Sequence, residues 1–61
     1  MKKRESWMKA GANVIANNMF GRIISLESNT IDGIEYVYYI TVHVNGYGDG
    51  RYHPNDIVFI S

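Results

Sequence analysis

The sequence contains no cysteine, a single proline and no long apolar run, and each absence excludes a class of protein. Without cysteine the chain forms neither a disulfide framework nor a cysteine-ligated metal site. No stretch approaches the about 20 consecutive apolar residues that a membrane-spanning helix needs. The basic start Met1–Arg4 is not followed by the apolar core of a signal peptide. We therefore expect a cytoplasmic protein that does not enter a membrane.

Net charge is also lacking, because six basic residues balance six acidic ones. Strong nucleic-acid binding relies on neutralising phosphates with lysine and arginine, so this balance is evidence against it. The same balance leaves little electrostatic repulsion between copies of the chain. Self-association is therefore permitted, and a homo-oligomer is one expected outcome.

With 61 residues the chain can form one domain with a small core. A domain of this size buries only about 60% of the surface that its unfolded chain exposes, so its stability is marginal. We divide the chain into a flexible basic N-terminal arm, residues 1–10, and a folded domain, residues 11–61, which begins at Gly11. Most of the basic residues lie in the arm: Lys2, Lys3, Arg4 and Lys9.

Short β-prone runs separated by turn residues predict an all-β fold. Five strands are expected, at residues 13–16, 22–31, 34–44, 51–53 and 58–60. Asp32-Gly33 favours a type I′ hairpin turn, and Pro54 is expected to begin one turn of 3₁₀ helix. Met19 and Phe20 lie in a predicted loop, where large apolar side chains must fold inward or form a contact surface. Turn signals about 8–12 residues apart are typical of a small barrel.

The predicted two-residue turn fixes the register of the long hairpin. Four facing pairs follow from it: Ile31 with Ile34, Asn29 with Tyr36, Glu27 with Tyr38, and Ile23 with Val42. Both faces of this strand pair are then partly apolar. Because side chains alternate between faces, either the strand pair is covered on both sides, or a twist or a β-bulge exchanges the faces midway, as in a strongly coiled barrel.

The segment Pro54-Asn55-Asp56-Ile57-Val58, with Gly50 and Tyr52 before it, resembles the 3₁₀ turn and last strand of SH3-like barrels. The segment from Gly11 to Ile23 resembles the opening strands of the Tudor and KOW branches of that group. The resemblance covers about residues 11–60. It implies a five-stranded SH3-like small barrel with a 3₁₀ turn before the last strand.

A binding role follows from this resemblance, because contact surfaces in such barrels lie among two loops and the 3₁₀ turn. The leading expectation is a non-catalytic small binding module for a protein or peptide partner. The Ala-Leu-Tyr-Asp-Tyr type motif of peptide-binding SH3 domains is absent, so proline-rich ligands are not expected. The resemblance implies these binding residues: Tyr47, Arg51, Tyr52, Asn55 and Ile57.

Two other functions stay open on the sequence. One is a self-associating structural subunit that pairs through a sheet edge. The other is nucleic-acid binding, in which aromatic side chains would stack on bases. The basic residues for it would be Lys2, Lys3, Arg4, Lys9, Arg22 and Arg51.

Catalysis and cofactor binding are not expected. His43 and His53 have no convincing acidic residue at metal-ligand spacing, so no metal site is predicted. No nucleophile stands beside Asp49, His53 or Asp56, and a barrel of this size offers little volume for a dry pocket. The glycine-rich stretch 46–50 is not followed by a helix that could bind a phosphate.

Overall fold

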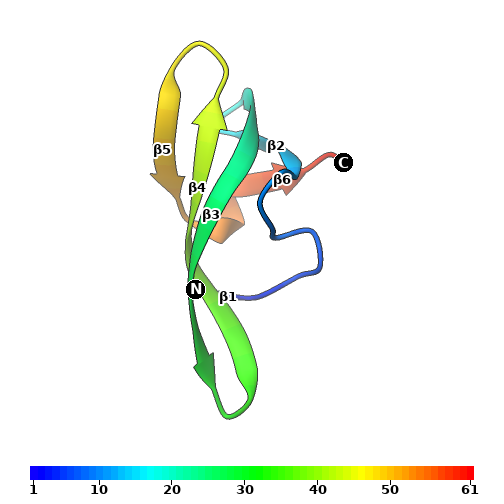
Figure 1. Cartoon of the computed structure of the whole chain (residues 1–61), viewed down its shortest axis with the longest axis vertical. Helices are drawn as coiled ribbons and strands as arrows, with labels where there is room; N and C mark the ends of the chain where they lie inside the picture. Colours follow the sequence, from blue (N-terminus) through cyan, green and yellow to red (C-terminus); the bar gives the residue numbers. More distant parts are fainter.

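Antiparallel strands and one turn of 3₁₀ helix make up most of the computed structural model, which describes all 61 residues. The strands curl into a half-barrel (Figure 1), so the predicted all-β class is confirmed. No helix in the structure has the length and hydropathy that crossing a membrane requires. In chain order the elements are β1 (Lys2–Lys3), β2 (Asn13–Ala16), β3 (Met19–Ile31), β4 (Ile34–Val44), β5 (Gly48–Tyr52), η1 (Pro54–Asp56) and β6 (Ile57–Phe59).

The strands pair in the order β6-β2-β3-β4, and two further strands share the outer edge of β4. β1 pairs with the first half of β4, where Lys2 faces Val37. β5 pairs with the second half, from Ile40 to Val44. β6 returns from the far end of the chain to lie beside β2, and this pairing brings the C-terminus next to Asn13.

The β3–β4 hairpin has the predicted turn, with positive φ angles of 52° at Asp32 and 80° at Gly33. Its register confirms three of the four predicted pairs, but Glu27 faces Tyr39 instead of Tyr38. The register shifts between Glu27 and Ser28 and shifts back between Ile23 and Ser25. The two shifts leave Tyr38 and Ile24 as unpaired extra residues, which is what β-bulges produce.

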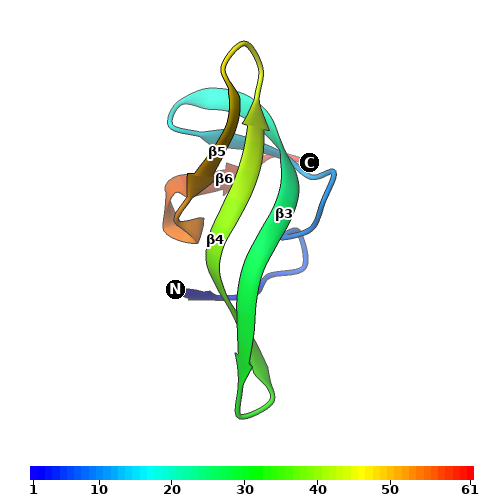
Figure 2. The same ribbon diagram turned by 60° about the vertical axis from the view of Figure 1, so that its left-hand side comes forward.

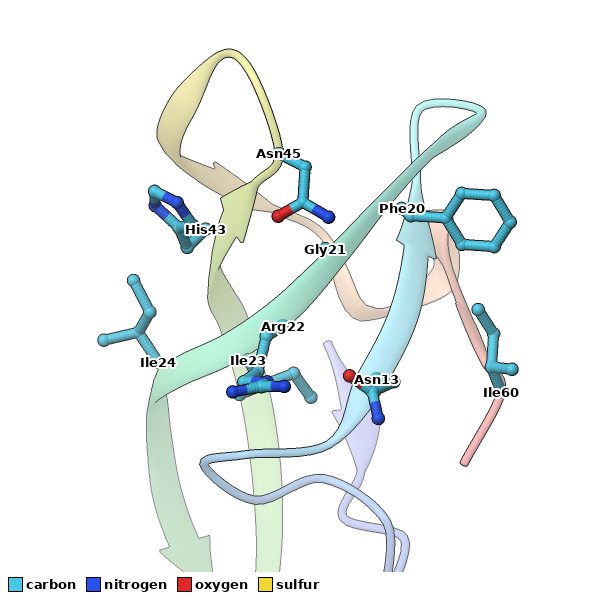
Figure 3. A pocket seen from close by; sticks show the side chains of 9 residues that line it. All are labelled: Asn13, Phe20, Gly21, Arg22, Ile23, Ile24, His43, Asn45 and Ile60. Atoms are coloured by element: carbon cyan, nitrogen blue, oxygen red, sulfur yellow. The ribbon is translucent and has the colours of Figure 1, made fainter.

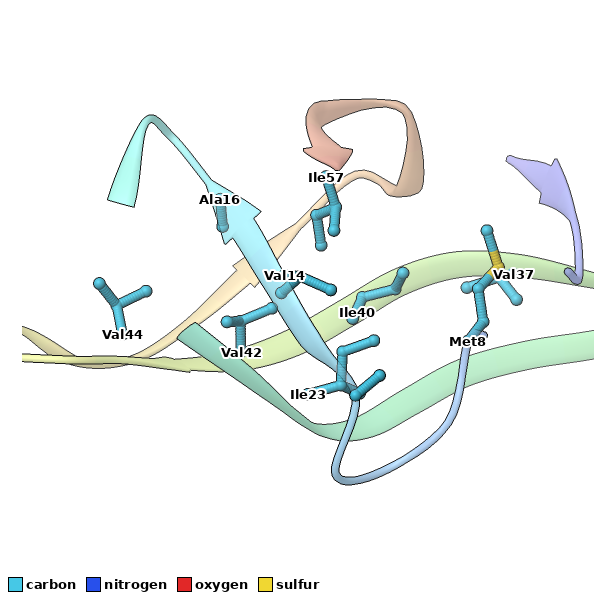
Figure 4. Close-up of a cluster of buried hydrophobic side chains, with 10 residues drawn as sticks. Met8, Val14, Ala16, Ile23, Val37, Ile40, Val42, Val44 and Ile57 are labelled. Atoms are coloured by element: carbon cyan, nitrogen blue, oxygen red, sulfur yellow. The ribbon is translucent and has the colours of Figure 1, made fainter. Parts of the chain in front are cut away.

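The bulge at Tyr38 explains why β4 has two apolar faces in the sequence. Val37 and Ile40 are both fully buried, although strict alternation would place them on opposite faces of the sheet. The extra residue between them turns both side chains toward the core, so of the two alternatives the exchange of faces is confirmed. The core is wholly apolar (Figure 4): Met8, Ala12, Val14, Ala16, Ile23, Val37, Ile40, Val42, Val44 and Ile57.

Residues 1–10 pack on the sheet, which differs from the separate arm inferred from the sequence. The amide of Arg4 donates a backbone hydrogen bond to the Glu35 carbonyl oxygen at 2.9 Å, continuing the pairing of β1. Met8 is fully buried in the core, and the Trp7 ring stacks on Phe59 with centroids 5.4 Å apart. Charge composition alone suggested a solvated arm, but Trp7 and Met8 cover the sheet. The mobility of this segment stays a prediction.

Replacing Gly33 with valine is expected to destabilise the fold by about 1–2 kcal/mol, because a β-branched residue resists positive φ. A Cβ at Gly33 meets no atom within 4 Å, so the cost is backbone strain alone. Gly33→Asn is the matched control, since asparagine tolerates this conformation. Urea denaturation of both variants measures the difference, and equal midpoints would contradict the strain argument.

Candidate binding groove

The five residues implied by the SH3-like resemblance do not share one surface. Tyr47 stands at the tip of the β4–β5 turn, 80% exposed, and Asn55 is exposed in η1. Arg51 and Tyr52 are neighbours in β5, so their side chains point to opposite faces. Tyr52 packs against the core, and Ile57 belongs to it, with only 6% of its surface exposed. Ile57 is therefore a core residue and offers no contact surface.

Arg51 makes its contacts within its own sheet. Its Nε and Nη2 atoms donate hydrogen bonds to the Glu27 carboxylate at 2.8 and 3.0 Å. Its guanidinium carbon lies 4.3 Å from the centroid of the Tyr39 ring, close enough for a cation–π contact. Arg51 thus joins β5 to β3 across the outer face of β4.

Two basic residues of the N-terminal segment are also held by carboxylates. The Arg4 guanidinium lies 3.0 Å from Glu35, and the Lys2 ammonium lies 3.0 Å from Glu5. The pKa of Glu35 is lowered by the hydrogen bond from the Ser28 hydroxyl and then by that from Arg4. The pKa of Glu5 is lowered chiefly by its hydrogen bond from Lys2.

The remaining basic residues, Lys3, Lys9 and Arg22, have no ion pair. Each lines a different hollow of the surface. The six basic residues that nucleic-acid binding would use are therefore not brought together as a single free basic surface. Only the hollow at Arg22 combines an unpaired guanidinium with several exposed large apolar side chains.

This groove has a volume of about 440 Å³ and lies where β2, β3 and β4 meet the C-terminal residues. In the view of Figure 3, Phe20 and Ile60 lie on one side of Arg22, with Ile24 and His43 on the other. Phe20 is 65% exposed, and Ile24 and Ile60 are each almost half exposed. We call this site the Arg22 groove. The side chains that line it include those of Asn13, Phe20, Arg22, Ile24, His43 and Ile60.

The course of β3 explains how the groove forms. Gly21 and Ile23 are buried whereas Phe20 and Arg22 are exposed, as alternation along a strand requires. The same alternation exposes Ile24, the extra residue of the bulge, directly after the buried Ile23. Two apolar side chains therefore flank Arg22 on the solvent side of β3.

The polar groups of the groove are a guanidinium, an imidazole and an amide. Arg22 donates no hydrogen bond to another side chain and has no carboxylate partner. The His43 Nδ1 atom lies 2.8 Å from the Asp49 carboxylate, which leaves its other ring nitrogen without a protein partner. Asn13 donates from its amide to the Ser61 hydroxyl at 3.3 Å. The structure has no group of three potential ligand side chains that could hold a metal ion.

The sequence interpretation named Arg22 only for nucleic-acid binding and did not place the other groove residues in a site. One signal was present, since two large apolar residues in a short segment had to fold inward or form a contact surface. In the structure the two residues have different environments. Met19 packs on the core, and Phe20 is exposed at the groove. The contribution of Ile60 arises only once β6 pairs with β2.

Comparisons of this chain with protein-family models, with curated proteins and with solved structures found no match. The groove is therefore interpreted from its own chemistry.

Proposed function

We propose that this protein is a non-catalytic binding module for a protein or peptide, and that the Arg22 groove is its contact surface. One observation carries the proposal: Arg22 is the only arginine without a carboxylate partner, and exposed apolar side chains surround it. Arginine and aromatic residues are enriched in the centres of protein interfaces and among the residues that dominate binding energy.

The groove fits a segment that carries an apolar side chain next to a carboxylate. A guanidinium binds a carboxylate through two parallel hydrogen bonds, a geometry that lysine lacks. Phe20, Ile24 and Ile60 would lose exposed apolar surface to the neighbouring side chain of the ligand, at about 25 cal/mol per Å² buried. Nucleic acid fits less well, because acidic side chains already neutralise Lys2, Arg4 and Arg51.

We further propose that the domain is an SH3-like barrel of the Tudor or KOW kind. The support is the course of the chain from β2 to β6. β2 pairs with both β3 and β6, and the 3₁₀ turn η1 stands between β5 and β6. Function still depends on the groove and its side chains, because one fold hosts many activities.

Selecting random peptides on the immobilised protein tests the proposed function. The selected peptides should share an acidic residue beside an aromatic or aliphatic one. Arg22→Glu should weaken their binding at least about tenfold, because a charge that matches the ligand becomes one that repels it. Calorimetric titration of a synthetic selected peptide measures the change.

Lys9→Glu is the matched control, since Lys9 also lacks an ion pair and lies outside the groove. It makes the same change of charge and should leave peptide affinity within about twofold. An equal loss in both variants would show that overall charge, not the groove, determines binding. Tight, steeply salt-dependent binding of single-stranded oligonucleotides would favour the nucleic-acid function instead.

A further inference from the structure

The β3–β4 hairpin extends beyond the core as a two-stranded ribbon, visible at the lower end of Figure 2. β2 pairs with β3 only as far as Arg22, and the backbone of Ile23 bonds to Gly11 and Ala12. From Ser25 to Ile31, β3 has β4 on one side and no backbone partner on the other. We call residues 25–31 of β3 the open edge.

At alternate residues of the open edge the peptide groups point away from β4 and have no backbone partner. The Thr30 amide donates to the side-chain oxygen of its neighbour Asn29 at 3.0 Å, so it points away from β4. Peptide groups alternate in direction along a strand, and Ser28 therefore presents its N–H and C=O to the same side. The shift at Glu27/Ser28 adds its extra residue to β4, so the alternation continues to Leu26.

The open edge has few of the residues that normally protect a sheet edge from pairing. Lysine, proline and inward charges discourage edge-to-edge pairing. The open edge contains no lysine and no proline, and its one charged residue, Glu27, is held by Arg51. The other edge of the ribbon is covered, because β1 pairs with Tyr36 and Val37 of β4.

We propose that two copies of this chain pair through their open edges, antiparallel about a two-fold axis at Ser28. A second copy fits because the edge is complementary to itself. Glu27 then faces Asn29, Leu26 faces Thr30, and no like charges oppose one another. The zero net charge of the chain adds no repulsion.

Pairing also removes a weakness of the ribbon. A two-stranded ribbon is marginally stable in water, whereas two joined ribbons make a continuous antiparallel sheet of four strands. Because β1 covers the opposite edge, pairing ends at two copies and does not propagate into a filament. The Arg22 groove lies outside residues 25–31, so this inference does not depend on the proposed function.

A disulfide cross-link tests the pairing, because the chain has no cysteine of its own. In a hydrogen-bonded antiparallel pair the facing Cα atoms are about 5.5 Å apart, within the range of a disulfide. Ser28→Cys should therefore form a disulfide-linked dimer under mild oxidation. The matched control is Thr30→Cys, whose two copies would be four residues apart along the strands, about 14 Å.

The expected yield of linked dimer is at least about tenfold higher for Ser28→Cys than for Thr30→Cys. Equal yields would indicate random collisions and would overturn the proposal. Ser28→Cys also removes the hydrogen bond from the Ser28 hydroxyl to Glu35, so Ser28→Ala serves to show that the fold tolerates this loss.

Sedimentation equilibrium of the unmodified chain gives a second, independent test. The wild-type chain should form dimers, and Thr30→Pro should raise the dissociation constant at least about tenfold by removing an edge donor. Proline is tolerated where the lost N–H faces solvent, and Thr30→Ala controls for the side chain. A monomer at millimolar concentration, a dimer unaffected by Thr30→Pro, or unlimited growth with concentration would each refute the two-fold pairing. If the partner of the open edge is a strand of another protein, the isolated chain should remain a monomer in this experiment.

Discussion

Gly21→Ala is expected to cost about 3 kcal/mol of folding free energy, the upper end of what overpacking a core costs. A Cβ at this position would lie 2.6 Å from Val42 Cγ1 and 2.7 Å from the His43 carbonyl oxygen. The oxygen belongs to the backbone of β4, so it cannot rotate away as a side chain can. Relief requires that β3 and β4 separate where β3 also carries the Arg22 groove.

Gly50→Ala provides the matched control for this prediction. The three atoms nearest to its Cβ would all belong to the Tyr52 side chain, with the hydroxyl oxygen at 2.9 Å, and the end of a side chain can shift where a backbone carbonyl cannot. Chemical denaturation followed by far-ultraviolet circular dichroism should show a loss for Gly50→Ala of less than about half that of Gly21→Ala. Equal losses would mean that the β3–β4 approach at Gly21 is not the constraint.

Gly21 also illustrates the limit of the sequence interpretation of the fold. The second strand was predicted to begin at Arg22, whereas β3 begins three residues earlier, at Met19. Local signals found the elements that depend on neighbouring residues, such as the Asp32-Gly33 turn and the 3₁₀ turn at Pro54. Only glycine fits at position 21 because Val42 and the backbone of the next strand lie close to it. No local sequence pattern encodes this contact.

The misplaced pair at Glu27 has the same kind of cause. A two-residue turn fixes the register near the turn, and the three confirmed pairs follow from it. The bulge at Tyr38 arises because burial of both Val37 and Ile40 is favoured over strict alternation. The sequence indicated an exchange of faces as one of two alternatives, but the position of the exchange depends on the packed core.

The candidate site was less predictable than the fold, because a charge is free or paired according to contacts distant in the sequence. Arg51 is bound by Glu27, 24 residues away, and Arg4 by Glu35, 31 residues away. Arg22 stands out only after these pairs are known. The SH3-like resemblance likewise placed Ile57 at a surface, whereas the pairing of β6 with β2 buries it.

Met8→Ala is expected to cost about 2–5 kcal/mol, the range for truncating a buried methionine to alanine. Met8 is among the largest fully buried side chains and comes from the segment that composition assigned to a flexible arm. The backbone of Met8 is also held in place, because the Arg4 guanidinium donates a hydrogen bond to the Met8 carbonyl oxygen at 3.1 Å. The N-terminal segment therefore closes the core at the end where Val37 lies.

Met1→Ala is the matched control, because Met1 is 62% exposed and surface substitutions change stability by about 0.5 kcal/mol or less. Urea denaturation can follow Trp7, the only tryptophan, whose ring is stacked on Phe59. Circular dichroism, which follows the sheet, should give the same midpoints as the Trp7 signal, because the N-terminal segment and the sheet then unfold in one event. If Met8→Ala were as stable as Met1→Ala, residues 11–61 would form the folded unit by themselves, as the basic composition of the first ten residues had predicted. A large loss in Met8→Ala alone would make residues 1–10 part of the domain.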